Sequence, residues 1–300
     1  MPRLRSTVVL CYHRVAAPRA DPHGLCVHPE RFADQLRALA HVADPVPLSE
    51  VVRAGRGPRI AVTFDDGYAD SLDAALPLLS EAGVPAAFFI TTGTLNRDEF
   101  WWDRLARLLL HDSAGARLLA LELAGRRLWL DARSPAARER AHWALWHRLR
   151  VRPEEEIAAL LDHLEGTIGA PAASPARPLT DAELGALAAA EGVDIGAHSV
   201  THPSLAAHPV SVQRGEITGS RTHLEQLLGR PVRFFAYPYG GPQDVNDDTV
   251  RCVAAAGFAG AFTTMAAPVR RRHDPRLLPR LVVRDWDGQR LVRELGAVSR

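Results

Sequence analysis

Two adjacent carboxylates end a short apolar run in the first quarter of the sequence. The segment reads IAVTFDDG over residues 60–67, and its β-branched and aromatic side chains predict a buried strand. An ionised carboxylate buried without a partner is costly, so Asp65 and Asp66 are expected at the end of that strand. Successive strand residues point to opposite sides, so one carboxylate could hold a metal ion while the other moves a proton. An isolated Asp-Asp-Gly sequence is otherwise typical of a simple turn.

A second segment, IGAHSVTHP over residues 195–203, carries two histidines four residues apart. One helical turn or a compact loop can bring His198 and His202 to one point. With one carboxylate they form a facial His₂Asp set with open positions, which is typical of a catalytic metal site. Two ordinary loop histidines are the alternative, because the chain has 13 histidines and this spacing can arise by chance. The strand-end carboxylates favour the metal site.

A third segment, FAYPYGG over residues 235–241, ends another predicted strand in a tight turn. Pro238 and the pair Gly240-Gly241 suit a turn that presents its backbone to a ligand. Tyr237, Pro238 and Gly240 are therefore expected beside a bound substrate. Without the other two segments, a plain connection between a strand and a helix would be the favoured interpretation.

Composition and charge narrow the class of protein. The 300 residues, 47% hydrophobic and 24% charged, have the composition of a soluble globular protein with a sizeable core. The net charge of +1 gives no electrostatic case for nucleic acid or an anionic membrane as a partner. Three widely spaced cysteines predict no disulfide framework. No apolar run reaches transmembrane length, and the run after Arg5 is too short for a signal peptide, so a cytoplasmic location is expected.

Near-continuous apolar runs alternate with amphipathic helical patterns along most of the chain. Strands are predicted at residues 7–12, 59–64, 85–91, 193–197, 232–236, 259–264 and 281–286. This alternation is typical of a parallel sheet in an α/β fold. About seven such units favour a closed or nearly closed parallel barrel, in which chemistry lies at the carboxyl ends of the strands.

The alternation breaks between about residues 96 and 178. Helices are predicted at 101–110, 136–149 and 154–164 and a hairpin at 119–130, followed by a proline-rich linker. Because no clear boundary precedes this segment, it is interpreted as an insertion into a single domain that spans residues 1–300.

The three segments together resemble the polysaccharide deacetylases, metal-dependent hydrolases with a distorted (β/α)₇ barrel. TFDDGY, HSVTHPSL and FAYPYG carry the resemblance, which runs from about Val8 to Trp286 and covers the insertion least. The implied fold class is an α/β barrel of this type with a helical insertion.

The resemblance also implies roles for particular residues. Asp66, His198 and His202 would bind one divalent metal ion, most often zinc, and Asp65 would be the general base that activates the attacking water. The developing oxyanion would be held by the metal and by a backbone N–H of the third segment, that of Tyr239.

The sequence departs from the family's pattern at two places. Many members begin the third motif with an arginine that pairs with the base aspartate, and here that position is Ala236. Many members also end with a leucine-x-histidine motif whose histidine is the general acid, and the last predicted strand, LPRLVVR over residues 278–284, has no histidine. Either the enzyme is crippled or other residues fill both roles.

Two residues are candidates for those roles. The first and last strands of a barrel are neighbours, so a histidine after the first strand can reach the place that a last-strand histidine would occupy. His13, in a Tyr-His sequence that resembles the exopolysaccharide branch of the family, is the candidate general acid. Its alternative is a strand-end histidine bonded to a loop. Arg280 is the candidate for orienting Asp65.

Aromatic residues supply the remaining candidates. Trp101, Trp102 and Trp286 could form a wall on which sugars stack, although a tryptophan pair that opens an amphipathic helix more often packs inside the protein. Tyr68, directly after Gly67, has the same two interpretations, and Trp102 and Tyr68 are taken as candidate substrate contacts.

The sequence thus predicts a metal-dependent hydrolase that removes N-acetyl groups from an amino-sugar polysaccharide or oligosaccharide. Its cofactor would be one divalent ion, with zinc the first choice, and its partner an acetylated glycan. A hydrolase of small non-sugar amides is one alternative, and it predicts a narrow pocket instead of an open groove. A non-catalytic glycan-binding module is the other, but a pure binder has no need of metal ligands together with a base.

Overall fold

The computed structural model describes residues 4, 6–18, 20–52, 59–110, 117–123, 125–169 and 176–299. The chain divides into two compact units, one of Met1–Asn96 with Leu179–Arg300 and one of Arg97–Pro178. They are called the barrel unit and the insertion unit below, and each has its own buried apolar cluster. That the whole chain folds as a single domain stays a prediction.

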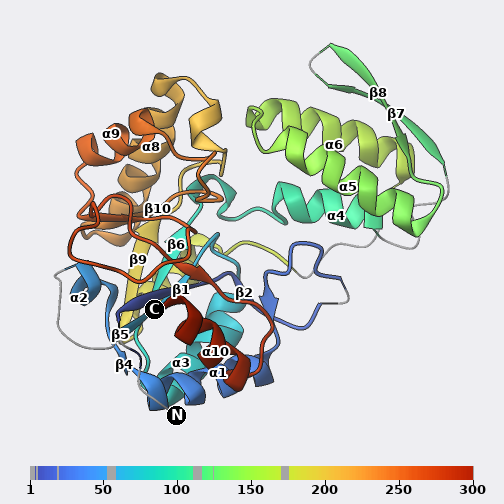
Figure 1. Cartoon of the computed structure of the whole chain (residues 1–300). Helices are drawn as coiled ribbons and strands as arrows, with labels where there is room; N and C mark the ends of the chain where they lie inside the picture. Colours follow the sequence, from blue (N-terminus) through green and yellow to red (C-terminus); the bar gives the residue numbers. More distant parts are fainter. Residues whose placement is uncertain are drawn as a thin grey trace. The chain divides into compact units, whose positions relative to one another are not determined.

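The barrel unit is built on a parallel sheet of eight strands. Seven follow one another in space in the order β11 (Gly260–Phe262), β10 (Phe234–Ala236), β9 (Val193–Ala197), β6 (Ala86–Ile90), β5 (Arg59–Phe64), β1 (Val8–Tyr12) and β12 (Leu281–Val282), and β4 (Asp44–Pro45) also pairs with β5. A parallel bridge joins Phe262 of β11 to Leu278, three residues before β12, so the sheet curls round and its two ends meet (Figure 1). The predicted distorted α/β barrel is confirmed.

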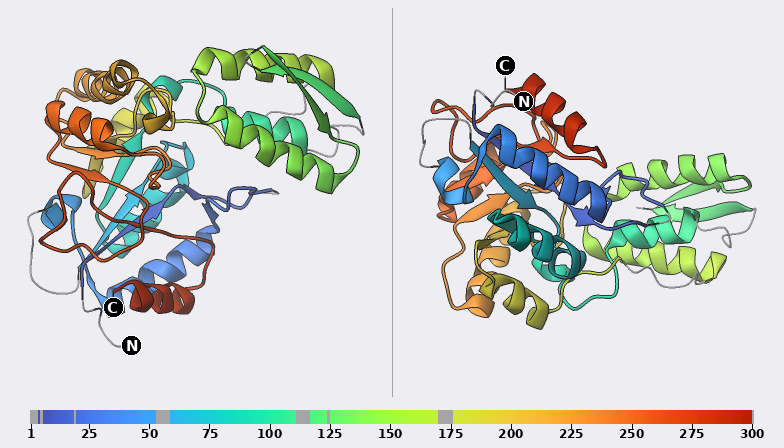
Figure 2. Two further views of the ribbon diagram at one scale, coloured as in Figure 1. Left: turned by 45° about the horizontal axis from the view of Figure 1, so that its top comes forward. Right: turned by 90° about the horizontal axis from the view of Figure 1, so that it is seen from below.

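Helices cover the outside of this sheet. They are α1 (Pro29–Val42), α2 (Leu48–Val52), the π-helical turn η1 (Ser71–Ala75) that runs into α3 (Leu76–Ala82), the short 3₁₀ turns η2 (Thr92–Thr94) and η4 (Leu205–Ala207), α7 (Asp181–Ala189), α8 (Val210–Leu228), α9 (Asp247–Ala255) and α10 (Gly288–Val298). The first and last helices, α1 and α10, pack side by side (Figure 2). A two-stranded parallel sheet, β2 (Arg14–Val15) with β3 (Cys26–Val27), follows β1 and was not predicted.

Local sequence explains where several helices begin and end. Thr180 and Glu183 form a capping box at the start of α7, with each side chain accepting from the other's backbone N–H. Gly83 and Gly229 end α3 and α8 in the left-handed conformation, which costs glycine little.

The barrel interior changes from apolar to polar along the strands. Alternate strand residues point outward to the helices, as Leu10 and Tyr12 do in the larger buried cluster. Inward-facing residues in the first half of the strands, such as Val9 and Ala61, belong to a separate apolar cluster. Farther along the same face lie the buried polar side chains of Cys11, Thr63, Asp65 and Arg280. This polar end of the interior is where the motif residues gather.

The last predicted strand, residues 281–286, is shorter than the sequence suggests. The strand β12 stops at Val282. The side-chain amide of Gln35 in α1 donates to the carbonyl oxygens of Arg284 and Trp286 at 3.1 and 2.7 Å. A side chain from outside the sheet therefore satisfies the backbone groups that a longer strand would have paired.

The insertion unit consists of α4 (Trp101–Leu110), α5 (Pro135–Leu149), α6 (Glu154–Ile168) and the antiparallel hairpin of β7 (Leu118–Leu123) and β8 (Arg126–Asp131). Leucines on one side of each element form its core, as the predicted helices and hairpin require. Arg107 of α4 bonds both Glu99 and Glu165, which ties α4 to α6 within the unit. Among the described helices of either unit, none combines the length and hydrophobicity needed to cross a bilayer.

Candidate active site

The predicted site residues of the barrel unit follow the carboxyl ends of neighbouring strands. His13 follows β1, Asp65 and Asp66 follow β5, His198 follows β9, and the turn 237–240 follows β10. Parallel pairing places these strand ends at one edge of the sheet. The segments, which are up to about 230 residues apart in the sequence, therefore meet in space.

Asp66, His198 and His202 form a compact set of ligand atoms, called the His₂Asp set below. Asp66 Oδ1 lies 3.4 Å from His198 Nε2 and 3.3 Å from His202 Nε2. One donor atom from each residue lies within 4.8 Å of the others, and all three residues are buried. Two imidazole nitrogens and one carboxylate oxygen suit zinc and other first-row divalent ions.

The hydrogen bonds and charges around the His₂Asp set fit a cation. His198 Nδ1 lies 2.8 Å from the carbonyl oxygen of Ala236, which fixes the ring and leaves Nε2 toward Asp66. Burial raises the pKa of Asp66, but hydrogen bonds from the two histidines hold it well below its ordinary value. Burial lowers the pKa of His198, yet the neighbouring carboxylates leave it raised, whereas burial dominates at His202 and lowers its pKa. The residues present therefore fit a divalent ion.

The backbone at this site is strained. Among the described residues, five other than glycine have φ in the left-handed region, and four of them lie here: Asp66, Ser199, His202 and Tyr239. Such a conformation costs about 1–3 kcal/mol and persists only where its surroundings hold it. Packing and hydrogen bonds therefore hold these four residues in unfavourable conformations, as is common at functional sites.

Two acidic residues that the sequence did not single out hold the loops of the site. Glu216 of α8 accepts hydrogen bonds from the backbone N–H groups of Val200 and Thr201, each at 2.8 Å. Asp244 accepts from the Ser204 hydroxyl at 2.6 Å and from the Gly241 N–H at 3.2 Å, so it joins the histidine loop to the third segment. Glu216 gave no local signal because it lies within a helix. An Asp three residues after a Gly-Gly turn is a recognisable turn residue.

Asp65 is paired with Arg280. Guanidinium nitrogens Nη1 and Nη2 lie 2.6 Å from Oδ1 and Oδ2 respectively, and the two side chains are 0% and 2% exposed. The same guanidinium donates to the Thr63 hydroxyl and, through Nε, to the Thr263 carbonyl, both at 3.1 Å. Burial raises the pKa of Asp65, but the charge and hydrogen bonds of Arg280, together with the nearby histidines, outweigh it and the pKa lies below its usual value. The carboxylate is therefore ionised at neutral pH.

His13 and Cys11 also lie close to Asp65. One donor atom from each of Cys11, His13 and Asp65 lies within 4.8 Å of the others, and Cys11 Sγ is 3.4 Å from Asp65 Oδ2. Burial lowers the pKa of His13 in spite of the two nearby carboxylates. Cys11 was not among the predicted site residues, although its place on the inward face, two residues after Val9, could have indicated it.

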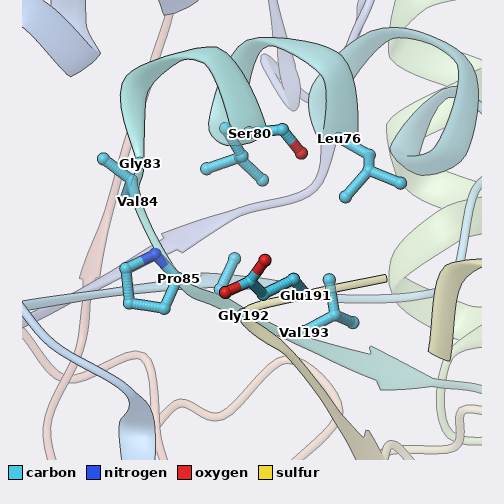
Figure 3. A pocket seen from close by; sticks show the side chains of 10 residues that line it. Leu76, Ser80, Gly83, Val84, Pro85, Glu191, Gly192 and Val193 are labelled. Carbon is cyan, nitrogen blue, oxygen red and sulfur yellow. The ribbon is translucent and has the colours of Figure 1, made fainter. Parts of the chain in front are cut away.

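A pocket of about 360 Å³ lies at the opposite end of the sheet (Figure 3). Its lining includes Val84 and Pro85 just before β6 and Glu191 and Gly192 just before β9. These are the amino ends of the strands, so the pocket is separate from the motif residues.

Comparison with protein-family models gives a match to the polysaccharide deacetylases over residues 53–113 and 175–261. The matched stretches contain all three motif segments, and the break between them falls in the insertion. The chain belongs to the polysaccharide deacetylase family. It is thus a hydrolase of the class that acts on carbon–nitrogen bonds other than peptide bonds.

Solved structures share the deacetylase fold. The Streptococcus pyogenes deacetylase PplD, in complex with acetate, matches with a TM-score of 0.63 at 18% identity, covering 97% of this chain and 99% of that chain. IcaB from Ammonifex degensii matches with a TM-score of 0.63 at 19% identity, covering 98% and 99%. A de-N-acetylase from Aggregatibacter actinomycetemcomitans has a TM-score of 0.61 at 14% identity, covering 96% and 99%. Comparison with curated protein sequences gave no significant match.

This deacetylase has no arginine at the start of its third motif, and Ala236 is buried there among apolar residues. The guanidinium that pairs with Asp65 comes instead from the segment before β12, which enters the barrel interior. The turn of the third motif depends on glycine: Gly240 has φ +65°, and a Cβ there would lie 2.7 Å from the Thr264 backbone nitrogen. Tyr239 packs its ring against His202, with the ring centres 4.7 Å apart.

The side chains of three predicted substrate contacts are buried. Tyr237 is fully buried in the outer core, and its hydroxyl donates to the Arg276 carbonyl at 2.8 Å. Tyr68 is 1% exposed, with the guanidinium carbon of Arg14 lying 4.6 Å from its ring centre. Trp102 is buried and stacks on Phe100 in the insertion unit. The roles of these three residues as substrate contacts stay predictions.

Proposed function

We propose that this deacetylase uses a divalent metal ion to remove N-acetyl groups from an amino-sugar polysaccharide or oligosaccharide. The observation that carries the proposal is the meeting of the His₂Asp set, the Asp65–Arg280 pair and His13 at one edge of the sheet. The family match and the fold shared with a de-N-acetylase support the same reaction.

Asp66, His198 and His202 would hold the ion, for which zinc is the first choice. A divalent ion at this place supplies Lewis acidity to the attacking water and to the acyl oxygen. The contact between His198 Nδ1 and the Ala236 carbonyl keeps the ligand nitrogen aimed at the site before any ion arrives.

Asp65 is the proposed general base. Its carboxylate is ionised because Arg280 keeps its pKa low, so it can accept a proton from the attacking water. Arg280 also fixes both oxygens, which limits rotation of the carboxylate. In the proposed mechanism Arg280 acts through Asp65 and is a positioning residue.

His13 is the proposed general acid. Burial lowers its pKa, so the ring starts neutral and takes up the proton that Asp65 has accepted. This direction is downhill, because a carboxyl group is a stronger acid than an imidazolium. The ring then gives the proton to the departing amine nitrogen as the carbon–nitrogen bond breaks. One proton thus passes from water to the leaving group within one cluster of side chains.

The backbone N–H of Tyr239 is the proposed donor to the oxyanion. The left-handed φ of Tyr239 and the tight turn at Gly240 fix the direction of the peptide groups in this segment. Pro238 and Gly240 are proposed to lie beside the substrate through their backbones.

The test is acetate release from N-acetylglucosamine oligomers by the purified chain, with and without a chelator and with zinc restored. Asp65→Asn should abolish release while the protein keeps its metal. A matched control is Asp73→Asn, which makes the same change at an exposed residue of η1. Release from small non-sugar amides but from no oligomer would replace the glycan by a small substrate. Glycan binding without any release, unchanged in Asp65→Asn, would make the chain a binding module.

A further inference from the structure

A second group of metal-binding atoms lies directly beside the His₂Asp set. It consists of Cys11 Sγ, a ring nitrogen of His13 and a carboxylate oxygen of Asp65, and is called the Cys11 cluster below. Donor atoms around a tetrahedral ion with bonds of about 2.0–2.3 Å lie roughly 3.5 Å apart. The Cys11 cluster, in which all three atoms lie within 4.8 Å of one another, needs only a small closure to reach that spacing.

The polar atoms of the Cys11 cluster have capacity left for a ligand. His13 Nδ1 is buried and has no hydrogen-bond partner among the described residues. Asp65 Oδ2 accepts hydrogen bonds from Arg280 at 2.6 Å and from the Cys11 thiol at 3.4 Å. Loss of the thiol proton would free both the sulfur and the second lone pair of that oxygen for an ion. His13 is partly exposed, so the cluster has an opening to solvent.

The charges permit one cation in addition to the one proposed at the His₂Asp set. Binding would release the thiol proton of Cys11 to solvent, so thiolate and carboxylate would together bring two negative charges beside the single positive charge of Arg280. Burial raises the pKa of the Cys11 thiol well above its ordinary value, so an ion must bond sulfur strongly to displace that proton. A set of one sulfur, one imidazole and one carboxylate therefore selects zinc or cadmium over magnesium and calcium.

We propose that the Cys11 cluster is a second, inhibitory site for a thiophilic divalent cation. Asp65 Oδ2 lies 3.9 Å from His198 Nε2, so the two sites are adjacent, and an ion in the second one takes hold of both the proposed base and the proposed acid. Excess zinc then stops the reaction that the first ion supports. The inhibition rests on the proposed function, whereas the binding of the second ion does not.

The binding experiment uses the metal-free full-length chain and cadmium. Wild-type protein should bind two cadmium ions and develop the ultraviolet charge-transfer band of a cadmium–thiolate bond. Cys11→Ala and Cys11→Ser should each bind one ion and show no band; the serine variant keeps a hydroxyl donor next to Asp65 and guards against a folding defect. Asp66→Asn should lose one ion and keep the band. Cys252→Ala, another buried cysteine, should behave as wild type.

Three binding outcomes would overturn the proposal. They are the absence of a thiolate band at any cadmium concentration, a band that persists without Cys11, and a band that disappears together with the ion lost in Asp66→Asn.

The activity experiment measures acetate release as zinc is raised. The rate of acetate release by the wild-type protein should rise with the first equivalent of zinc. It should then fall by at least about 100-fold, because general acid–base catalysis contributes roughly that factor. The rate of the Cys11→Ser variant should rise with the first equivalent and then stay constant as more zinc is added. Magnesium should not inhibit either protein. Binding of two ions without activity on any glycan would contradict the proposed function but would still support the second metal site. Activity that excess zinc does not lower would remove the inhibitory role.

Discussion

Arg280 and Asp65 are joined by two hydrogen bonds of 2.6 Å although 215 residues separate them. Arg280 lies between Leu278, which bridges to β11, and β12, which pairs with β1. The segment that brings the two ends of the sheet together therefore also delivers the guanidinium to the candidate base. Closure of the barrel and the electrostatics of Asp65 depend on the same few residues.

Replacing Arg280 by methionine should shift the pH dependence of acetate release toward higher pH. Arg280 is the main group that holds the folded pKa of Asp65 below its ordinary value, and without the guanidinium only the nearby histidines would oppose the raising effect of burial. The carboxylate would then be protonated over part of the pH range where the wild type is active. The acidic limb of the rate profile should move up, and stability at neutral pH should fall by about 3–5 kcal/mol as the buried charge loses its partner.

The control is Arg276→Met, which removes a half-exposed arginine from the same segment. A variant at Arg280 that loses stability but keeps the acidic limb where it was would show that Arg280 supports the fold without acting on the base.

The fold could be predicted from local patterns. Apolar strands and amphipathic helices depend on neighbouring residues, and β5, β9 and α4 begin and end at the residues that the sequence indicates. The motif residues could be selected because burying carboxylates and histidines at the end of an apolar strand costs free energy unless they have partners there. Their proposed roles stay predictions.

Contacts that depend on tertiary structure could not be predicted. Glu216 reaches the histidine loop only because α8 packs beside β9. The burial of Tyr237 could have been predicted, because a residue two after Phe235 shares its outward face. The burial of Tyr68 and Trp102 could not, since it depends on neighbours that are distant in the sequence.

Glu216→Gln should weaken metal binding without removing a ligand. Both backbone donors, Val200 and Thr201, use the same carboxylate oxygen, and the Thr201 hydroxyl uses the other. An amide can satisfy only part of this pattern, so the strained loop that carries His202 should loosen. Outer partners of metal ligands are typically worth roughly 10–100-fold in metal affinity, and zinc titration against a competing chelator would measure the change.

The matched control for Glu216 is Glu225→Gln, the same change in the same helix. Glu225 accepts from Arg221 and the Val232 N–H and lies away from the histidine loop. Equal losses of zinc affinity in the two variants would mean that α8 stability, and not the loop contact, controls the metal.

The increase in Tm that zinc produces should grow with pH. In the metal-free protein the folded pKa of His198 is raised above 6.5, so its proton contributes stability that is complete below that value and is lost as pH rises through the folded pKa. The ion requires the same nitrogen without its proton, so binding strengthens over the same rise. Thermal unfolding with and without zinc at a series of pH values above 6.5 would measure both trends. A zinc effect that is constant over this range, or unchanged in His198→Gln, contradicts the assignment of His198 as a ligand.

His13→Gln should discriminate between substrates by their leaving groups. An amine must be protonated as it departs, whereas an activated phenol leaves as its anion. Loss of a general acid should therefore lower the rate on N-acetylated oligomers by roughly 10²–10⁴-fold and leave hydrolysis of an activated aryl acetate much closer to wild type. Asp65→Asn is the necessary comparison, because loss of the base should impair both substrates. If His13→Gln slowed both substrates equally, His13 would contribute to the architecture of the site or to binding, and the proton for the leaving amine would have to come from another group.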